Sequence, residues 1–155
     1  MDILPDLAAL SDAEENALIT RLEDREQSLS ALRKRYHERI DALRAAREKR
    51  LRARIALGTV TVVGAGPLER SLFRGSGELP ERDLEALPEP ETLTDDALLT
   101  LLRTLEAEED DVSFRRREAQ GHLDIVRAHR RGEPVDLASL PAVLVAPRPL
   151  QGDAA

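Results

Sequence analysis

Residues 17–43 read ALITRLEDREQSLSALRKRYHERIDAL, in which apolar side chains return every three or four positions. This spacing places them along one face of an α-helix. No Gly or Pro lies between Ser11 and Gly58, and Ser11 followed by Glu14 is the pattern of a helix-capping box. The sequence therefore predicts one helix over residues 12–56, about 67 Å long at ~1.5 Å per residue. Its expected packing seam consists of Ile19, Leu22, Leu29, Tyr36, Ile40 and Leu43.

A second periodic stretch covers residues 94–131, with Thr94 as its expected N-cap and Gly132 and Pro134 beyond its end. Because a parallel partner would require a connection along the whole helix, we expect the two helices to lie antiparallel. We therefore predict an all-α protein, a long antiparallel two-helix coiled-coil hairpin with an extended connector. The seam of the second helix consists of Leu98, Leu102, Leu105, Val112, Ala119, Leu123 and Val126.

The rest of the chain divides into a lead-in of residues 1–11, a connector of residues 57–93 and a tail of residues 132–155. The connector is rich in Gly and Pro and is long for a link between two helices, so it is either mobile or packed as a strap. Within it, Thr59–Val63 can form a short extended segment. In the tail, Val135–Leu144 can form a short apolar helix that packs on the hairpin or on a partner.

The composition of the chain excludes several kinds of protein. Its 155 residues include no Cys, which rules out disulfides, Cys-based zinc sites and thiol catalysis. Only three residues are aromatic, which argues against a thick globular core. The chain begins without the basic and apolar regions of a signal peptide, and it contains no stretch that is long and apolar enough to span a bilayer. We therefore expect a soluble, cytoplasmic protein with no membrane partner.

The net charge of −7 conceals a strong segregation of charge along the chain. Residues 1–30 carry eight acids and two bases, whereas residues 31–54 carry three acids and ten bases, so the local charges are −6 and +7. The acidic total argues against DNA as a partner, yet it allows a local anion site. His37, His122 and His129 are not spaced like metal ligands, and no nucleophile–base pair indicates an enzyme. Neither a bound metal nor catalysis is expected.

The two helical stretches resemble each other when one is shifted by 83 residues. The polar pattern Glu-x3-Ser-x2-Arg-x3-Gln-x3-Asp occurs over residues 109–124 and, with His in place of Gln, over residues 26–41. At ~100° per residue, these positions fall within a helical stripe about 80° wide. The shared polar positions indicate an internal duplication. They are Glu26, Ser30, Arg33, His37 and Asp41 in the first copy, and Glu109, Ser113, Arg116, Gln120 and Asp124 in the second.

The Glu and Arg of each copy occupy seam positions at which Leu or Ile would stabilise helix pairing. Because a buried charge is costly unless it is paired, two interpretations stay open. In the first, carboxylates and guanidiniums pair across the hairpin and fix its register. In the second, the polar stripe binds a ligand. Two copies brought face to face favour the ligand. Arg is a bidentate donor to guanine O6 and N7 and to phosphate, and Asp can accept from the N1 and N2 donors of guanine, so a guanine nucleotide fits the stripe.

The duplicated pattern and its flanking residues resemble the signature of the RsiG family of actinobacterial anti-sigma factors, over residues 10–48 and 93–131. The resemblance implies that two cyclic di-GMP molecules bind between the helices. It also implies that the loaded form captures a sporulation sigma factor of the flagellar class, WhiG, and keeps it from RNA polymerase. In such a site Arg33 and Arg116 contact guanine and phosphate, and the Asp of each copy takes the Watson–Crick edge of guanine. The resemblance assigns the rest of the site to Glu26, Ser30, Glu109, Ser113 and Gln120.

His37 departs from the family pattern, because neutral His offers one donor and one acceptor where the pattern has the amide of Gln. The presence of both copies in one chain implies a monomer. Two alternative functions stay open. One is a ligand-free coiled-coil adaptor, and the other is a nucleic-acid-binding helical protein that uses the basic stretch 44–54, although that stretch lacks aromatic residues for stacking on bases.

Overall fold

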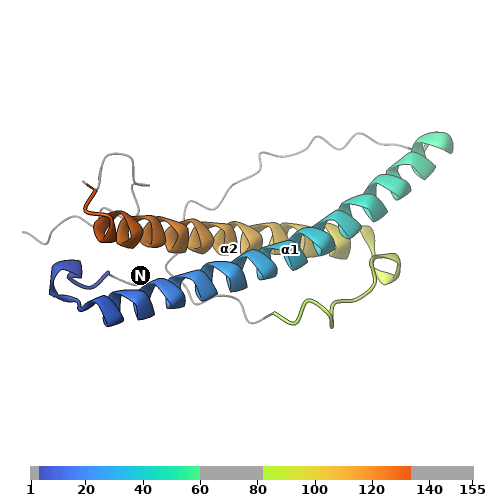
Figure 1. Cartoon of the computed structure of the whole chain (residues 1–155). Helices are drawn as coiled ribbons and strands as arrows, with labels where there is room; N and C mark the ends of the chain where they lie inside the picture. Colours follow the sequence, from blue (N-terminus) through green and yellow to red (C-terminus); the bar gives the residue numbers. More distant parts are fainter. Residues whose placement is uncertain (1–3, 60–81, 134–155) are drawn as a thin grey trace, which may run out of the picture. The chain divides into compact units, whose positions relative to one another are not determined.

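The computed structural model describes residues 4–59 and 82–133. Within these ranges it contains no strand, and α1 and α2 pack against each other (Figure 1). The predicted all-α fold with two long helices is therefore confirmed. The elements, in chain order, are the 3-10 helix η1 (Leu7–Ala9), the helix α1 (Asp12–Ala56), the 3-10 helix η2 (Pro90–Thr92) and the helix α2 (Asp95–Arg130).

The chain divides into two compact units, and each long helix contributes residues to both. Unit 1 comprises Met1–Gln27 and Arg116–Ala155, and unit 2 comprises Ser28–Arg115. Each unit therefore has its own pairing between a stretch of α1 and a stretch of α2.

Side-chain caps begin both long helices. The backbone N–H of Ser11 donates to Glu14 Oε2 at 2.8 Å, and the N–H of Glu14 donates to Ser11 Oγ at 3.4 Å, which is the predicted capping box. The hydrogen bonds from Ser11 lower the pKa of Glu14. At the start of α2, Thr94 Oγ1 accepts a hydrogen bond from a first-turn N–H at 3.2 Å, as its expected role as N-cap requires. The first turns of both helices are thus fixed by local hydrogen bonds.

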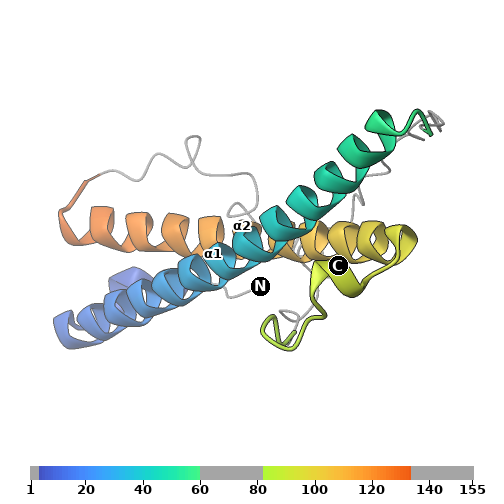
Figure 2. The ribbon, with the colours of Figure 1, turned by 90° about the vertical axis from the view of Figure 1, so that its right-hand side faces the viewer.

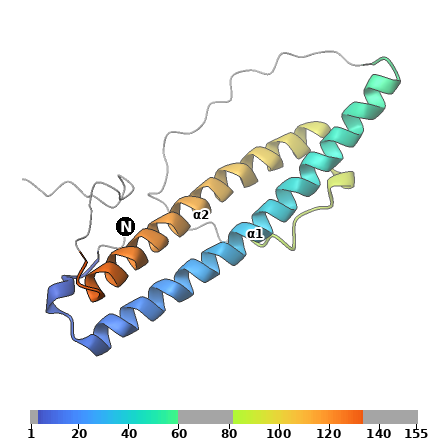
Figure 3. The same ribbon diagram turned by 45° about the horizontal axis from the view of Figure 1, so that its top comes forward.

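In unit 1 the core lies between the first turns of α1 and the last turns of α2. Leu18 and Leu22 pack with Leu123 and Val126, and all four are buried. Residues 4–11, which include η1, lie beside the last turns of α2 (Figure 3). This part of the lead-in therefore completes a small apolar core. The partly buried side chains packed against that core are Leu4, Leu7, Leu10 and Ile19.

Polar contacts fix the antiparallel register of unit 1. Glu15 on α1 lies 3.3 Å from His129 Nδ1 on α2, and Arg127 donates to Glu23 at 2.5 Å. Arg130 donates to Asn16 Oδ1 at 2.6 Å. Residues 15 and 16 of α1 pair with residues 129 and 130 of α2, whereas Glu26 pairs with Arg116, so the two stretches run in opposite directions.

In unit 2 the seam is apolar and closely packed. The α1 side chains Tyr36, Ile40 and Leu43 are at most 3% exposed, and Leu105 and Val112 of α2 are fully buried. The period-3.5 pattern of the sequence therefore identifies the buried face of both helices, except that Leu18 is buried where Ile19 was expected and Ile19 is only partly buried. The last turns of α1 extend past the start of α2 (Figures 1 and 3). Accordingly, the exposed large apolar side chains of the described chain lie at this end, and they are Leu51, Ile55 and Leu57.

Residues 82–93 of the connector pack on unit 2 as a strap that leads into α2 (Figure 2). Leu84 is 1% exposed, and its carbonyl accepts a hydrogen bond from Arg39 Nε at 2.8 Å. Arg50 donates to the carbonyl of Pro90 at 2.9 Å. Of the two readings of the connector, packing as a strap thus holds for these residues. The proposed extended segment falls outside the described residues except for Thr59, and the proposed tail helix falls outside them entirely.

Tyr36 is linked to the strap through a partly buried polar network. Its hydroxyl donates to Glu108 Oε2 at 3.0 Å, and the guanidinium of Arg82 donates to both oxygens of the same carboxylate at 2.7–2.9 Å. Burial raises the pKa of Tyr36, and the hydrogen bond to Glu108 raises it further, so the phenol stays protonated.

Replacing Tyr36 with Phe is expected to lower the free energy of unfolding by about 1 kcal/mol, because one net hydrogen bond is lost while Arg82 still satisfies Glu108. Urea denaturation of the two proteins measures the difference. An unchanged midpoint with an unchanged slope would show that the hydroxyl contributes nothing to stability.

Candidate functional site

Two groups of polar side chains contain most of the residues of the duplicated pattern. In unit 2, Arg33 Nε shares its hydrogen between Glu109 Oε1 at 3.0 Å and Ser113 Oγ at 2.8 Å. Ser113 Oγ donates to the same Glu109 oxygen at 2.5 Å. His37 Nε2 lies 3.2 Å from that oxygen. We call Arg33, His37, Glu109 and Ser113 the Arg33 cluster.

The carboxylate of Glu109 is the electrostatic centre of the Arg33 cluster, and its side chain is 13% exposed. Burial raises the pKa of Glu109, but the hydrogen bonds from Ser113 and Arg33 and the charges of His37 and Arg33 outweigh burial. The pKa therefore lies below its ordinary value of 4.5. Glu109 is an anion at neutral pH, and it holds Arg33 in place.

The lowered pKa of Glu109 predicts that the free energy of unfolding depends on pH in the acidic range. Because the folded-state pKa of Glu109 is depressed, its stabilising contribution is complete above the ordinary value of 4.5 and is lost as the pH falls through the folded-state pKa. Glu109→Gln is expected to lower the free energy of unfolding by about 1–2 kcal/mol at neutral pH and to cost less in acid. Urea titrations on both sides of that range measure the difference. Parallel pH profiles for the two proteins would contradict this account.

In unit 1, Arg116 of α2 donates from Nη1 to Glu26 Oε1 of α1 at 3.2 Å. Its Nε is buried and has no hydrogen-bond acceptor within the described ranges. One and two turns further along α2, Gln120 Nε2 donates to Asp124 Oδ1 at 3.1 Å. The spacing of four residues places these side chains on the same face as Arg116. We call Glu26, Arg116, Gln120 and Asp124 the Arg116 cluster.

The Arg of each copy pairs with the Glu of the other copy. Arg33 pairs with Glu109 in unit 2, and Arg116 pairs with Glu26 in unit 1. This reciprocity is the arrangement that a duplicated pattern on two antiparallel helices produces. Each cluster therefore combines residues from both copies of the pattern. Two half-sites that were each built from one helix would instead keep the residues of one copy together.

Asp41 and Ser30 are the two pattern residues that do not belong to either cluster as defined here. Asp41 is 72% exposed and lies 3.8 Å from Arg44 on its own helix. Ser30 is half-buried on α1. The expectation that the two copies are brought face to face stays a prediction, since Arg33 and Arg116 belong to different units.

Sequence reasoning missed three polar features of unit 2. The carboxylate of Glu108 binds both Tyr36 and Arg82, and the second of these comes from the connector, which has no periodic pattern. Arg115 Nε is buried without an acceptor in the described part of the chain, although Arg115 lies outside the duplicated pattern. Only Tyr36 could have indicated this network from the sequence, because a buried Tyr on an otherwise aliphatic seam needs a hydrogen-bond partner for its hydroxyl.

Carboxylates neutralise much of the basic stretch 44–54. Arg44 donates to Glu106 at 2.7 Å, Arg52 donates to Glu48 at 2.5 Å, and Arg50 and Arg54 both pair with Asp95. These pairs reduce the positive field that a nucleic-acid backbone requires. They weaken the nucleic-acid alternative without testing it.

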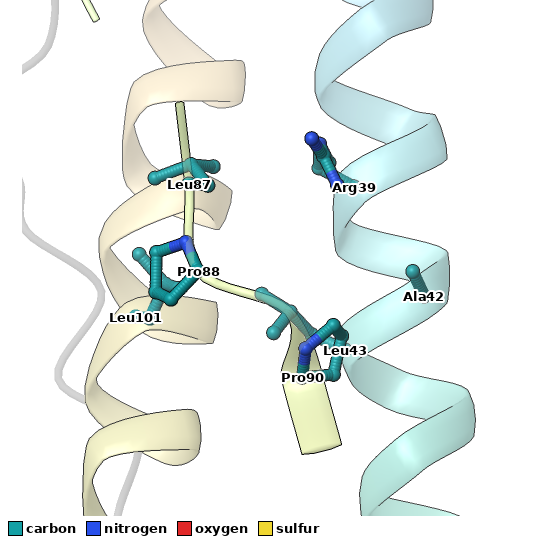
Figure 4. A pocket seen from close by; sticks show the side chains of 7 residues that line it. All are labelled: Arg39, Ala42, Leu43, Leu87, Pro88, Pro90 and Leu101. Carbon is teal, nitrogen blue, oxygen red and sulfur yellow. The ribbon is translucent and has the colours of Figure 1, made fainter. Parts of the chain in front are cut away.

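The remaining surface of the described chain offers little else. A small pocket in unit 2 contains none of the pattern residues (Figure 4). Across residues 4–59 and 82–133, no group of three or more His, Asp or Glu side chains is arranged to hold a metal ion. Neither long helix carries the apolar stretch that a bilayer-crossing helix needs. The pocket is lined by Arg39, Leu43, Leu87, Pro88, Pro90 and Leu101, together with Ala42.

Comparison with protein families identifies the family to which this chain belongs. The model of the RsiG-like family matches residues 1–65 and 81–144, which include both long helices and all the pattern residues. No curated protein and no solved structure matches the chain.

Proposed function

Because this chain belongs to the RsiG-like family, we propose that it is a cyclic di-GMP-dependent anti-sigma factor that withholds a sigma factor of the WhiG class from RNA polymerase. The family suggests an anti-sigma factor, implies a sigma factor as partner and is not an enzyme family. Cyclic di-GMP, the WhiG class and a role in sporulation are the finer parts of the proposal. RNA polymerase works in the cytoplasm, and we place the activity there.

The observation that carries the ligand proposal is that each cluster places an Arg, paired with a Glu, on a helix seam that is otherwise lined by apolar side chains. Arg116 carries five N–H donors, of which the described contacts use one on Glu26, and its buried Nε has no acceptor. A phosphate or the O6 and N7 edge of guanine presents two acceptors that match the guanidinium fork. Cyclic di-GMP offers both groups, and the carboxylate of Asp124 can accept from the guanine edge.

With His37 counted as neutral, the Arg33 cluster has a net charge of 0 and the Arg116 cluster has a net charge of −1, so an anionic ligand has to take the place of the Glu beside each Arg. In each cluster a single Glu neutralises the Arg, so a phosphate can replace the carboxylate without leaving the guanidinium unpaired. One ligand for each cluster gives two molecules of cyclic di-GMP per chain. Since both copies of the pattern lie in one chain, a monomer suffices.

The same ion pairs favour a second candidate, a ligand-free coiled-coil adaptor. Arg33 with Glu109 at 3.0 Å and Arg116 with Glu26 at 3.2 Å are already neutralised, as a device that fixes helix register requires. An adaptor of this kind would have a thermal midpoint that no guanine nucleotide changes.

Titration calorimetry of the full chain distinguishes the two candidates. The proposal predicts saturable heat with cyclic di-GMP at two molecules per chain, and a much weaker signal with cyclic di-AMP, because adenine presents an amino donor where guanine presents O6. The absence of heat with cyclic di-GMP, together with an unchanged thermal midpoint, would favour the adaptor.

A further inference from the structure

His37 and Gln120 occupy the same position of the duplicated pattern, 83 residues apart. Their side chains do different things. Gln120 Nε2 donates along its own helix to Asp124 at 3.1 Å. The ring of His37 instead turns across to α2, where Nε2 lies 3.2 Å from Glu109 Oε1. The two clusters therefore differ at the position where the sequence pattern differs.

The oxygen that His37 approaches is already occupied by other donors. Glu109 Oε1 accepts from Arg33 Nε at 3.0 Å and from Ser113 Oγ at 2.5 Å. A carboxylate oxygen accepts about two hydrogen bonds in its plane. Accordingly, His37 Nε2 is buried and lacks hydrogen-bond geometry despite its short distance. His37 and Arg33 thus compete for one acceptor.

Glu109 faces His37 from α2. On α1, Arg33 lies one turn before His37 and Asp41 lies one turn after it, 3.8 Å from Arg44. Among the charged side chains of the strap, Arg82 pairs with Glu108, Glu85 pairs with Arg35, and Asp83 accepts from the backbone of the strap. Protonation of His37 would therefore act mainly on the bond between Glu109 and Arg33.

We propose that His37 is a positioning residue that controls, through Glu109, whether Arg33 is available to an anionic nucleotide, so that the two clusters bind the ligand unequally. This inference rests on the proposed binding of cyclic di-GMP. A protonated imidazole pairs with Glu109 and releases Arg33 toward a phosphate. A neutral imidazole leaves Arg33 held by Glu109 and Ser113. In the Arg116 cluster the corresponding Gln120 has no charge to change.

Because His changes charge between about pH 5 and 8, the two binding events should separate with pH. Calorimetric titration of the full-length wild type with cyclic di-GMP at about pH 6 and about pH 8 is expected to resolve two classes of site, one of them at least about fivefold tighter at the lower pH. His37→Gln is expected to make that class independent of pH. The matched control His129→Gln removes a His that lies beside Glu15 in unit 1, and it should retain the wild-type pH ratio.

The possible results distinguish a failure of the role of His37 from a failure of the proposed binding of cyclic di-GMP. If wild type and His37→Gln bind with the same pH ratio, the role of His37 is wrong and the binding proposal stands. If neither protein binds at either pH, while circular dichroism shows both to be helical, both ideas fail. Should His37→Gln lose helicity, NMR titration of the wild-type imidazole with and without cyclic di-GMP decides the matter, because a positioning role requires the ligand to change its titration and an unchanged titration contradicts it.

Discussion

Arg116→Ala is expected to weaken the binding of cyclic di-GMP at the Arg116 cluster by at least about 100-fold, because it removes two or more charge-assisted hydrogen bonds to the ligand. The guanidinium lies on the seam with a buried Nε and a single described partner, Glu26. Titration calorimetry at matched protein concentrations measures the loss.

Arg117→Ala is the matched control for this prediction. Arg117 is the next residue of the same helix and is exposed, so its removal changes the net charge equally without touching the Arg116 cluster. The control should bind like the wild type. Wild-type heat in the Arg116 variant, or equal losses in both variants, would contradict the assigned site. Thermal midpoints of the two variants show whether a loss of binding reflects a loss of fold.

The second large effect concerns stability. Leu105→Ala is expected to lower the free energy of unfolding by about 2–5 kcal/mol, since Leu105 is fully buried in the seam of unit 2 and the substitution leaves a cavity. Leu51→Ala provides the control, because Leu51 is 48% exposed near the end of α1. That variant should stay within about 0.5 kcal/mol of the wild type. Similar losses in both variants, measured by urea denaturation, would mean that the seam is not where the structure places it.

The long helices could be predicted because their signals are local. The Ser11–Glu14 capping box, the absence of breakers and the apolar period together predict a helix over residues 12–56, and α1 spans Asp12–Ala56. The seam could be predicted for the same reason, since a period of 3.5 allows one buried face. The start of α2 followed from the capping chemistry of Thr94.

The strap could not be predicted beyond its existence. Residues 82–93 have no periodic pattern, and they are held by contacts such as that of Arg39 with the carbonyl of Leu84, a backbone group that every residue carries. Nothing in the sequence distinguishes the carbonyl that Arg39 selects. The same holds for Arg82, one of many arginines, whose partner Glu108 follows only from the packed structure.

The candidate site was predicted in its composition and only partly in its geometry. The spacing of the pattern predicts that Arg33 and Arg116 lie on the seam, and the contacts of each with a Glu of the opposite helix agree with that prediction. Spacing cannot say which way a side chain turns. The approach of His37 to Glu109 and the exposure of Asp41 depend on competition among neighbours for a few acceptors. The ligand-binding roles of all these residues stay predictions.

The most direct test of the central claim is a pull-down of a purified WhiG-class sigma factor by the immobilised full chain, with and without cyclic di-GMP. The account predicts that the sigma factor is retained only when the nucleotide is present, and that the Arg116→Ala chain retains none in either case. Equal retention with and without cyclic di-GMP, or no retention in both, would contradict a ligand-dependent anti-sigma factor.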